Sequence, residues 1–496
     1  MLKIAENANP NYLASIERII EVFPIEGADH LMRTVIGGFD MVISKDLKPG
    51  DLVVYFPVET QICHQFLEKN NLYEFSEAHL NARYQEISDL MTQANNETDT
   101  DTAKELIAKA KSMCGFFSNK RRVRMLKLRG QYSMGFVIPV QALRNAFPEL
   151  VGIDFEDYVG NQFNQIGDIE VCCKYIPITK NREPKMHCNP ENGAWKKLMR
   201  RTIKRFDKLI EGQFTFHYDT KQLEQDIDIL KPDDQITATV KVHGTSVILA
   251  NVLCNRQLTR WEKIKKFFGI KVQETEYSNI YSSRKVIKNR YINPKAHDFY
   301  SNDVWGSCNK VFSQFITPGM TVYGEIVGYC EGSNTMIQKN HDYGCKPGQW
   351  KFMPYRITLT AQDGSKTELS TLEVAEWTDH ILFNYGDMPA YGTYKISDVL
   401  MNMNFRFIGR VCEMYPDLTI DENWHANLLE RMKADKNMFG MELDEPMCKN
   451  KVPREGIVIR LLQDKYSRAW KLKSKRHYEL EAKQHDNGEV DMEEEA

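Results

Sequence analysis

The chain has 496 residues, and at ~150 residues per domain this length predicts two to four domains. Its 65 basic and 68 acidic residues leave a net charge of -3, which excludes a histone-like polybasic protein but permits a local basic surface. No apolar run approaches the roughly 20 residues that span a bilayer, and the N-terminal segment lacks the basic-then-apolar order of a signal peptide. We therefore expect a cytoplasmic protein.

The cysteines fit that compartment. There are 11 of them, scattered along the chain and without a C-x-x-C pair, so neither a zinc ribbon nor a thioredoxin-type site is indicated. One local cluster remains: Cys172, Cys173, His187 and Cys188. A metal site there is one interpretation, but buried free thiols are the favoured one.

Residues 1–175 are predicted to form a β-barrel domain. Short apolar runs alternate with turn signals such as Pro24, Gly37 and Pro49, a spacing typical of barrels and sandwiches. The polar stretch at about 75–118 has helical periodicity, split by the turn-like NNETDTDT, and is predicted to be a helical insertion. Strand character returns in RRVRMLKLRGQYSMGFVIPV.

The rest of the chain divides into three predicted parts. Residues 176–212 are predicted to be a basic linker or helix, which contains WKKLMRRTIKRFDKLIEG. Two interpretations of this segment carry equal weight: a solvated or packing helix face, and a surface that contacts phosphates. Residues 213–485 are mixed α/β: QITATVKVHGTSVILA, MTVYGEIVGYC and EGIVIRLL are typical of strands, whereas KQLEQDIDIL and ENWHANLLERMKADKNMF are typical of helices. The acidic end, 486–496, is predicted to be a disordered tail.

Lys241 is the first candidate for chemistry. It ends an alternating apolar run in TATVKVHGTSVIL and is followed by Gly244. A lysine desolvated beside other cations has a lowered pKa and becomes a nucleophile, and a nearby glycine permits close approach of a ligand. The plain alternative is an ordinary strand lysine before a turn.

Four more charged residues lie in or beside predicted strands. Glu325 stands between two glycines in VYGEIVG, and Glu455 precedes Gly456 in EGIVIR. Lys471 and Lys473 alternate in WKLK, so they are expected on one face of a strand. Taken one at a time, each has the plain alternative of an edge-strand charge.

In chain order these segments resemble the motif series of the covalent nucleotidyltransferase superfamily, which contains polynucleotide ligases and mRNA capping enzymes. The matching segments are KVHG at 241–244, YSSR at 281–284, VYGEIVG at 322–328, KFMPYRI at 351–357, EGIVIR at 455–460 and WKLK at 470–473. Within the superfamily the chain is most similar to RNA ligases, and LASIERIIEVFPIEGADHL, KPGDLVVYFPVET and VRMLKLRGQYSMGFVIPV resemble the N-terminal OB domain of one branch. The resemblance omits the 75–118 insertion and about 360–440.

The resemblance implies an α+β chain in which an OB-type barrel precedes a nucleotidyltransferase domain, with ATP and Mg²⁺ or Mn²⁺ as cofactors. Lys241 would accept AMP on Nζ, assisted by Lys471, Lys473 and Glu455. Glu325 and Glu455 would hold the metal through water. The implied nucleotide-binding residues are Lys241, His243, Gly244, Arg284, Glu325, Phe352, Lys471 and Lys473. Phe352 would stack on adenine, with Tyr355 as its competitor.

The implied function is ATP-dependent joining of a 3'-OH RNA end to a 5'-phosphate at nicks in an RNA duplex or RNA/DNA hybrid, through lysyl-AMP and AMP-capped 5'-end intermediates. The candidate RNA contacts are basic: Arg122, Arg124, Lys127, Arg129, Arg200, Arg201, Lys204 and Arg205. The alternatives are a catalytically inactive RNA end-binding protein, a capping-type guanylyltransferase and a tRNA-binding accessory module. The natural RNA and the oligomeric state stay open.

Overall fold

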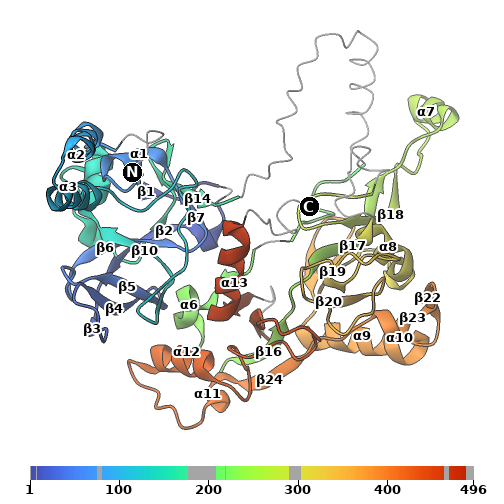
Figure 1. The fold of residues 1–496 in the computed structure, drawn as a ribbon. Helices are drawn as coiled ribbons and strands as arrows, with labels where there is room; N and C mark the ends of the chain where they lie inside the picture. Colours follow the sequence, from blue (N-terminus) through green and yellow to red (C-terminus); the bar gives the residue numbers. More distant parts are fainter. Residues whose placement is uncertain are drawn as a thin grey trace. The chain divides into compact units, whose positions relative to one another are not determined.

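The computed structural model describes residues 2–6, 8–74, 81–176, 208–217, 219–289, 303–462 and 468–487. The chain divides into two compact units: Met1–Pro177 with Glu481–Lys483, and Ile178–Leu480 with Gln484–Ala496 (Figure 1). Each unit has a hydrophobic core of its own. Within the described ranges, no helix is both long and apolar enough to cross a membrane.

The first unit is built from short antiparallel strands. Its four-stranded sheet has the order β10-β6-β2-β11, formed by Gly135–Pro139, Leu52–Pro57, Ala14–Arg18 and Gln162–Phe163. The smaller pairings join β3 (Phe23–Pro24), β4 (Leu31–Ile36) and β5 (Phe39–Ser44); β1 (Leu2–Lys3), β12 (Gln165–Ile166) and β13 (Ile169–Glu170); β7 (Thr60–Ile62) and β14 (Cys172–Lys174); and β8 (Leu126–Leu128) and β9 (Gln131–Ser133).

Helices complete this unit. The stretch expected to be a helical insertion contains α2 (Tyr84–Asn96) and α3 (Thr100–Ser112), which pack through the small apolar cluster of Ile87, Leu90 and Ala110. Asp99 separates them because its carboxylate accepts hydrogen bonds from the first amides of α3. The other helical segments are α1 (His64–Lys69), α4 (Gln141–Ala146), η1 (Pro10–Tyr12), η2 (Pro148–Leu150) and η3 (Phe155–Tyr158).

The second unit contains two five-stranded sheets. One has the order β18-β17-β19-β20-β21, formed by Thr275–Ser282, Thr245–Asn255, Met320–Gly328, Trp350–Thr360 and Lys366–Glu368. The other has the order β15-β26-β25-β16-β24, formed by Lys221–Gln222, Ala469–Lys473, Gly456–Leu461, Gln235–Lys241 and Phe405–Arg410. A two-stranded ribbon joins β22 (Pro389–Tyr391) and β23 (Tyr394–Lys395).

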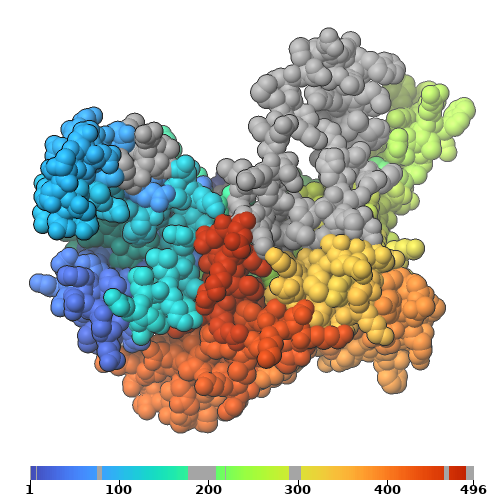
Figure 2. All heavy atoms as spheres, in the orientation of Figure 1, coloured from blue at the N-terminus to red at the C-terminus, as the bar shows by residue number. Residues whose placement is uncertain are grey.

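The helical segments of the remaining chain are α6 (Leu223–Asp226), α7 (Arg260–Phe267), α8 (Val304–Phe312), α9 (Thr371–Tyr385), α10 (Ile396–Val399), α11 (Val411–Met414), α12 (Trp424–Ala434), α13 (Lys475–Asp486), η4 (Ile227–Ile229) and η5 (Ser313–Phe315). The prediction of a helix in KQLEQDIDIL is wrong in part. Its first two residues pair in parallel with β26, and a short α6 and a 3₁₀ turn follow. Figure 2 shows α7, in pale green, standing out from its unit.

The chain crosses from one sheet to the other directly after Lys241. β16 ends at Lys241 in one sheet, and β17 begins at Thr245 in the other. Gly244 makes the crossing possible, because a Cβ there would lie 2.5 Å from the carbonyl oxygen of Ile326 on β19. Gly244 was predicted to make room for a ligand. Its missing side chain instead makes room for β19.

Candidate active site

The site forms at one end of three neighbouring strands. In the register of the sheet, Lys241 on β16 lies opposite Gly456 on β25, and Gly456 lies opposite Lys473 on β26. A Cβ on Gly456 would lie 2.1 Å from the carbonyl oxygen of Leu472, so only glycine permits this close pairing. The two lysines therefore flank the strand that begins immediately after Glu455.

Glu455 is the shared anion of this row. Its Oε1 lies 2.7 Å from Nζ of Lys241 and 3.7 Å from Nζ of Lys473. Burial alone would raise the pKa of the Glu455 carboxyl, but the charges of Lys241, His477, Lys473 and His243 outweigh it and hold the pKa well below its usual value. Glu455 is therefore a fixed negative charge that keeps the candidate nucleophile in place.

Lys471 shares a face of β26 with Lys473, as the alternation in the sequence predicts, while Trp470 and Leu472 are buried in the core on the other face. Burial and the ammonium of Lys473 lower the pKa of Lys471 to about 7, although Asp219 opposes the shift. Arg284 forms an ion pair with Asp219. Cationic groups from β16, β26 and the segment after β18 therefore converge on one region.

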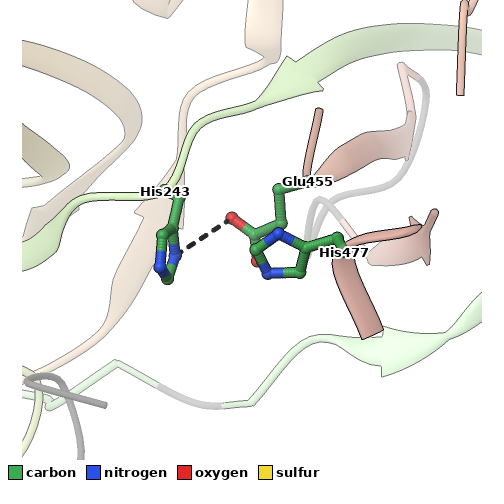
Figure 3. Close-up of side chains that lie close together, drawn as sticks. All are labelled: His243, Glu455 and His477. Carbon is green, nitrogen blue, oxygen red and sulfur yellow. Dashed lines mark ion pairs between the residues drawn. The ribbon is translucent and has the colours of Figure 1, made fainter. Parts of the chain in front are cut away.

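His243 and His477 extend the site around Glu455 (Figure 3). Nδ1 of His243 lies 3.7 Å from Oε2 of Glu455, and Nε2 of His477 lies 3.9 Å from Oε1. One ligand atom from each of the three residues lies within 4.8 Å of the others, and all three residues are buried. In the described part of the chain, Oε2 of Glu455 accepts no hydrogen bond. Two imidazoles and a carboxylate are a donor set that suits Mn²⁺ or another transition metal better than Mg²⁺, which prefers oxygen.

A third histidine supports this arrangement. The His341 ring lies 4.9 Å from the His243 ring, centroid to centroid. Burial and the neighbouring His243 lower the pKa of His341 to about 4, so at neutral pH the ring is uncharged. The backbone N–H of His243 donates to the hydroxyl of Tyr343 at 2.6 Å. His341 and Tyr343 thus fix the position of His243 without adding charge.

Glu325 lies on the other sheet. It pairs in register with Ser246, and the Ser246 hydroxyl donates to Oε1 of Glu325 at 2.9 Å. Glu325 is buried. Among the described residues it is not in the cluster of ligand atoms around Glu455. The structure therefore places the two carboxylates expected near a metal on different sheets.

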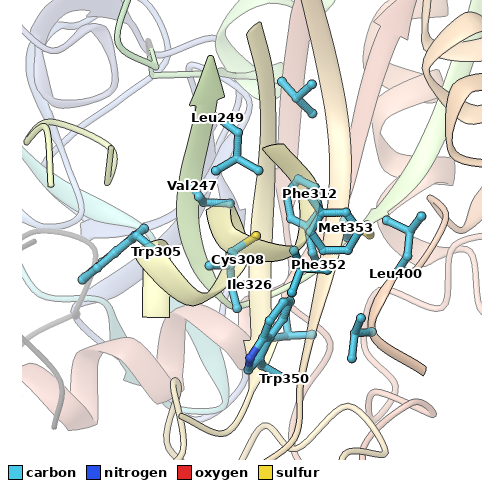
Figure 4. Close-up of a cluster of buried hydrophobic side chains, with 14 of the residues drawn as sticks. Val247, Leu249, Trp305, Cys308, Phe312, Ile326, Trp350, Phe352, Met353 and Leu400 are labelled. Carbon is cyan, nitrogen blue, oxygen red and sulfur yellow. The ribbon is translucent and has the colours of Figure 1, made fainter. Parts of the chain in front are cut away.

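The structure contradicts the expected role of Phe352. Phe352 is 0% exposed and belongs to the hydrophobic core, where it pairs with Ile326 and lies against Phe312 (Figure 4). A Cβ on Gly324 would lie 2.3 Å from its ring, so its face is covered by β19. Adenine has no access to this ring.

Tyr355, the competitor of Phe352, has a different environment. The register of β20 shifts at this residue, because Tyr323 pairs with Arg356 and Gly324 pairs with Pro354, which leaves Tyr355 as the extra residue of a bulge. Its hydroxyl lies 3.4 Å from Nδ1 of His217, and the guanidinium of Arg460 lies 5.6 Å from its ring centre. Tyr355 is only partly buried and replaces Phe352 as the candidate aromatic contact.

The basic residues expected to bind RNA divide into three groups. Arg122 is buried and donates from Nε and Nη2 to the Glu59 carboxylate at 2.7 and 2.6 Å, so its expected contact with RNA is wrong. Arg124, Lys127 and Arg129 are exposed on and beside β8. Four further candidates lie outside the described residues: Arg200, Arg201, Lys204 and Arg205.

Sequence reasoning missed His477, His341 and Asp219. Nothing in the spacing of these residues indicates a site, because they lie on separate segments that only the fold brings together. His477 follows Lys473 closely, and its proximity to the K-x-K segment was the one available signal.

The comparisons with known proteins agree with this architecture. A family model described as an OB-fold domain matches residues 13–91, and no curated protein matches the sequence. An apo mutant of Naegleria gruberi RNA ligase has a TM-score of 0.50 with 17% sequence identity, covering 95% of this chain and 98% of that one. The same ligase with PPi has a TM-score of 0.49 with 16% identity, covering 96% and 99%. A mutant with ATP and Mn has a TM-score of 0.49 with 17% identity, covering 94% and 98%.

The chain therefore has the fold of an RNA ligase, an α+β architecture with an OB-fold domain in its N-terminal part. At 17% identity this likeness is one of fold.

Proposed function

We propose that the protein is an ATP-dependent RNA ligase that joins a 3'-OH RNA end to a 5'-phosphate end at nicks in duplexes. The observation that carries the proposal is the row of Lys241, Glu455 and Lys473, with Lys471 on the same face of β26 as Lys473. A lysine held by one carboxylate among further cations suits covalent capture of a nucleotide.

In the first step Nζ of Lys241, as the free amine, attacks the α-phosphorus of ATP. An N–P bond forms, the bond to the bridging oxygen breaks, pyrophosphate leaves, and the amine proton passes to solvent. Lys471 and Lys473 would neutralise the charge that develops on the phosphates, which is the main demand of phosphoryl and nucleotidyl transfer. Arg284 and Tyr355 would hold the ribose and the base.

His243, Glu455 and His477 are the residues that would hold a divalent ion, whereas Glu325, held by Ser246 on the other sheet, would bind the ribose hydroxyls. When bound, Mn²⁺ or Mg²⁺ supplies charge neutralisation for the phosphates. The imidazoles would favour Mn²⁺ over Mg²⁺. Glu455, held ionised by its neighbours, would supply the negatively charged ligand for that ion.

The second and third steps transfer AMP and then release it. An oxygen of the RNA 5'-phosphate attacks the phosphorus of lysyl-AMP, the N–P bond breaks, and AMP caps the 5' end. The 3'-OH of the adjacent RNA end then attacks the capped phosphate, forms the phosphodiester bond and expels AMP. Exposed Arg124, Lys127 and Arg129 would neutralise phosphates of the duplex.

The test is incubation of the protein with α-labelled ATP and, separately, α-labelled GTP, with Mn²⁺ or Mg²⁺, followed by a denaturing gel. We expect covalent label from ATP that is lost in Lys241→Ala and retained in Lys346→Ala, an exposed lysine of the same unit. Label that survives Lys241→Ala would move the nucleophile elsewhere. Label from GTP alone would indicate capping chemistry, and no label from either would favour an inactive end-binding protein.

A further inference from the structure

The loop between β17 and β18, residues 256–274, forms a structured projection that we call the α7 arm. Asn255 and Thr275 pair in register at its base, and the backbone N–H of Arg256 donates to the carbonyl of Glu274 at 2.7 Å. Thr259 and Glu262 form a reciprocal capping box at the start of α7. The arm is therefore held in one shape by its own backbone and caps.

Further contacts lock the arm without a core. Arg256 forms an ion pair with Glu262, and Nζ of Lys266 lies 2.6 Å from the carboxylate of Glu274. Gly269 ends the helix with a positive φ of 74°. None of the residues of α7 is buried, although most short helices depend on burying an apolar face. Because these contacts within the arm stabilise the helix, its apolar face is available to a partner.

That apolar face is aromatic and exposed. Trp261 is 75% exposed, Phe267 84% and Phe268 72%. Trp261, Ile264 and Phe268 share one side of the helix because they are three and four residues apart, and the rings of Phe267 and Phe268 lie 5.5 Å apart in an edge-to-face arrangement. Such a set of large exposed rings marks a surface for a partner.

The arm is also strongly basic. It contains six basic and two acidic residues in a chain whose net charge is -3. Both acidic residues are engaged by Arg256 and Lys266, which leaves the exposed side chains of Arg260, Lys263, Lys265 and Lys271 as a local excess of positive charge. Rings for stacking and cations for phosphates are the combination that binds nucleic acid without sequence preference.

We propose that the α7 arm binds the RNA substrate at a distance from the joined ends, an inference that rests on the proposed ligase function. One strand connects the two places: β18 runs from the arm at Thr275 to Ser282, just before Arg284 (Figure 1). Its eight residues span about 25 Å at ~3.4 Å per residue. A duplex that advances roughly 3 Å per base pair would therefore meet the arm about eight base pairs from the nucleotide site.

RNA explains the arm better than a membrane surface does. A helix that lies in a bilayer interface buries a continuous apolar face along its length, whereas α7 has eight residues and exposes mainly rings beside lysines. Rings with a π face available suit unpaired or terminal bases.

The test measures binding of nicked RNA duplexes in which the 3' end at the nick is a 3'-deoxy nucleotide. This end has no hydroxyl to attack, so the nick is not sealed. Fluorescence anisotropy would compare a long duplex, with about eight base pairs on each side of the nick followed by unpaired nucleotides, with a short blunt-ended duplex of about five base pairs on each side. We expect the Trp261→Ala/Phe268→Ala variant to bind the long duplex at least tenfold more weakly and the short duplex as the wild type does. Phe383→Ala removes a ring that is 90% exposed on α9 and is the matched control, with unchanged binding of both.

A second variant tests the charges. Lys263→Gln/Lys265→Gln should reduce the slope of log Kd against log salt concentration by about 1–2 for the long duplex. Circular dichroism and thermal unfolding of each variant would verify the fold. We expect no change, because the substituted side chains are exposed and do not stabilise it.

Unchanged affinity of the aromatic variant for the long duplex would overturn the proposal, as would an equal loss for both lengths. If the variant instead lost co-sedimentation with vesicles of phosphatidylcholine and phosphatidylserine while binding RNA normally, the arm would be a membrane contact. Absence of ATP labelling in the wild type would contradict the proposed function, whereas the anisotropy comparison would still report on the arm.

Discussion

At the scale of residues, the site is organised around one buried carboxylate. Glu455 lies within 4 Å of charged or titratable atoms of Lys241, His243, Lys473 and His477. An anion in this position holds the ammonium of Lys241 and reduces the mutual repulsion of the cations around it. The cost of such an arrangement is that any change in one partner alters the balance of the others.

Lys471 shows that cost most directly. Its pKa falls from 10.5 to about 7 in the folded protein, so an ammonium there is unfavourable. The destabilisation is fully present below about pH 7 and fades as the pH rises toward 10.5, because only the unfolded chain binds the proton in that interval. We expect Lys471→Met to raise the free energy of unfolding at pH 7 by roughly 1–4 kcal/mol and to lower lysyl-AMP formation by at least two orders of magnitude.

Chemical denaturation at pH 7 and at pH 10 would check this, since the gain should shrink at the higher pH. Lys471→Arg keeps the charge and is the control that should not be stabilised. Equal gains at both pH values would show that packing, not desolvated charge, accounts for the effect.

At the same scale, His243 is the residue expected to set the metal preference of the proposed site. An imidazole at this position favours Mn²⁺, and a carboxylate would supply the oxygen donor that Mg²⁺ prefers. We expect His243→Asp to raise the rate of lysyl-AMP formation with Mg²⁺, relative to the rate with Mn²⁺, on the order of tenfold. Substitutions around metal ligands typically have effects of this size. His380→Asp, an exposed histidine on α9, should leave the ratio unchanged. A ratio unaltered by His243→Asp would place the metal away from this histidine.

At the scale of elements, the contact of β25 with β26 decides whether the charges meet. Gly456 lies opposite Lys473, and a side chain there would overlap the carbonyl of Leu472. We expect Gly456→Ala to destabilise the protein by at least about 1–3 kcal/mol through overpacking and to abolish measurable lysyl-AMP formation.

Hydrogen exchange would locate this effect. The amides of β25 and β26 should exchange faster in Gly456→Ala, whereas those of β17, β19 and β20 on the other sheet should keep their protection. Uniformly faster exchange would mean that the substitution lowers global stability without parting this strand pair.

At the scale of the whole molecule, the two units have separate cores. The apolar cluster of the first unit includes Phe56 and Phe163, and those of the second include Trp305, Trp350 and Trp470. A domain with its own core can fold alone. We expect the chain without residues 1–176 to unfold cooperatively and to form lysyl-AMP, but to seal nicked RNA at least tenfold more slowly.

Labelled ATP and a pre-adenylylated nicked duplex would separate the two activities. Sealing at the wild-type rate would show that the OB-fold domain serves another purpose, and loss of labelling in a folded fragment would show that the first unit takes part in nucleotide capture.

The sequence alone predicted the strands that carry the charged residues of the proposed site. The alternation in WKLK placed Lys471 and Lys473 on one face, and the apolar run before Lys241 predicted β16. These features are local, because strand periodicity and strand ends are written in adjacent residues. The order of the segments, together with their resemblance to RNA ligases, indicated the fold that the comparison with solved structures supports.

The tertiary structure alone decided which partners these residues meet. Local periodicity does not say which face of a strand is covered, so Phe352 was assigned to the ligand although β19 and Phe312 enclose it. Arg122 is buried because Glu59, far away in sequence, neutralises it. His477 joins His243 and Glu455 only when β16, β25 and α13 come together. Burial, register shifts and long-range ion pairs depend on contacts between distant segments, and these contacts exist only in the folded chain.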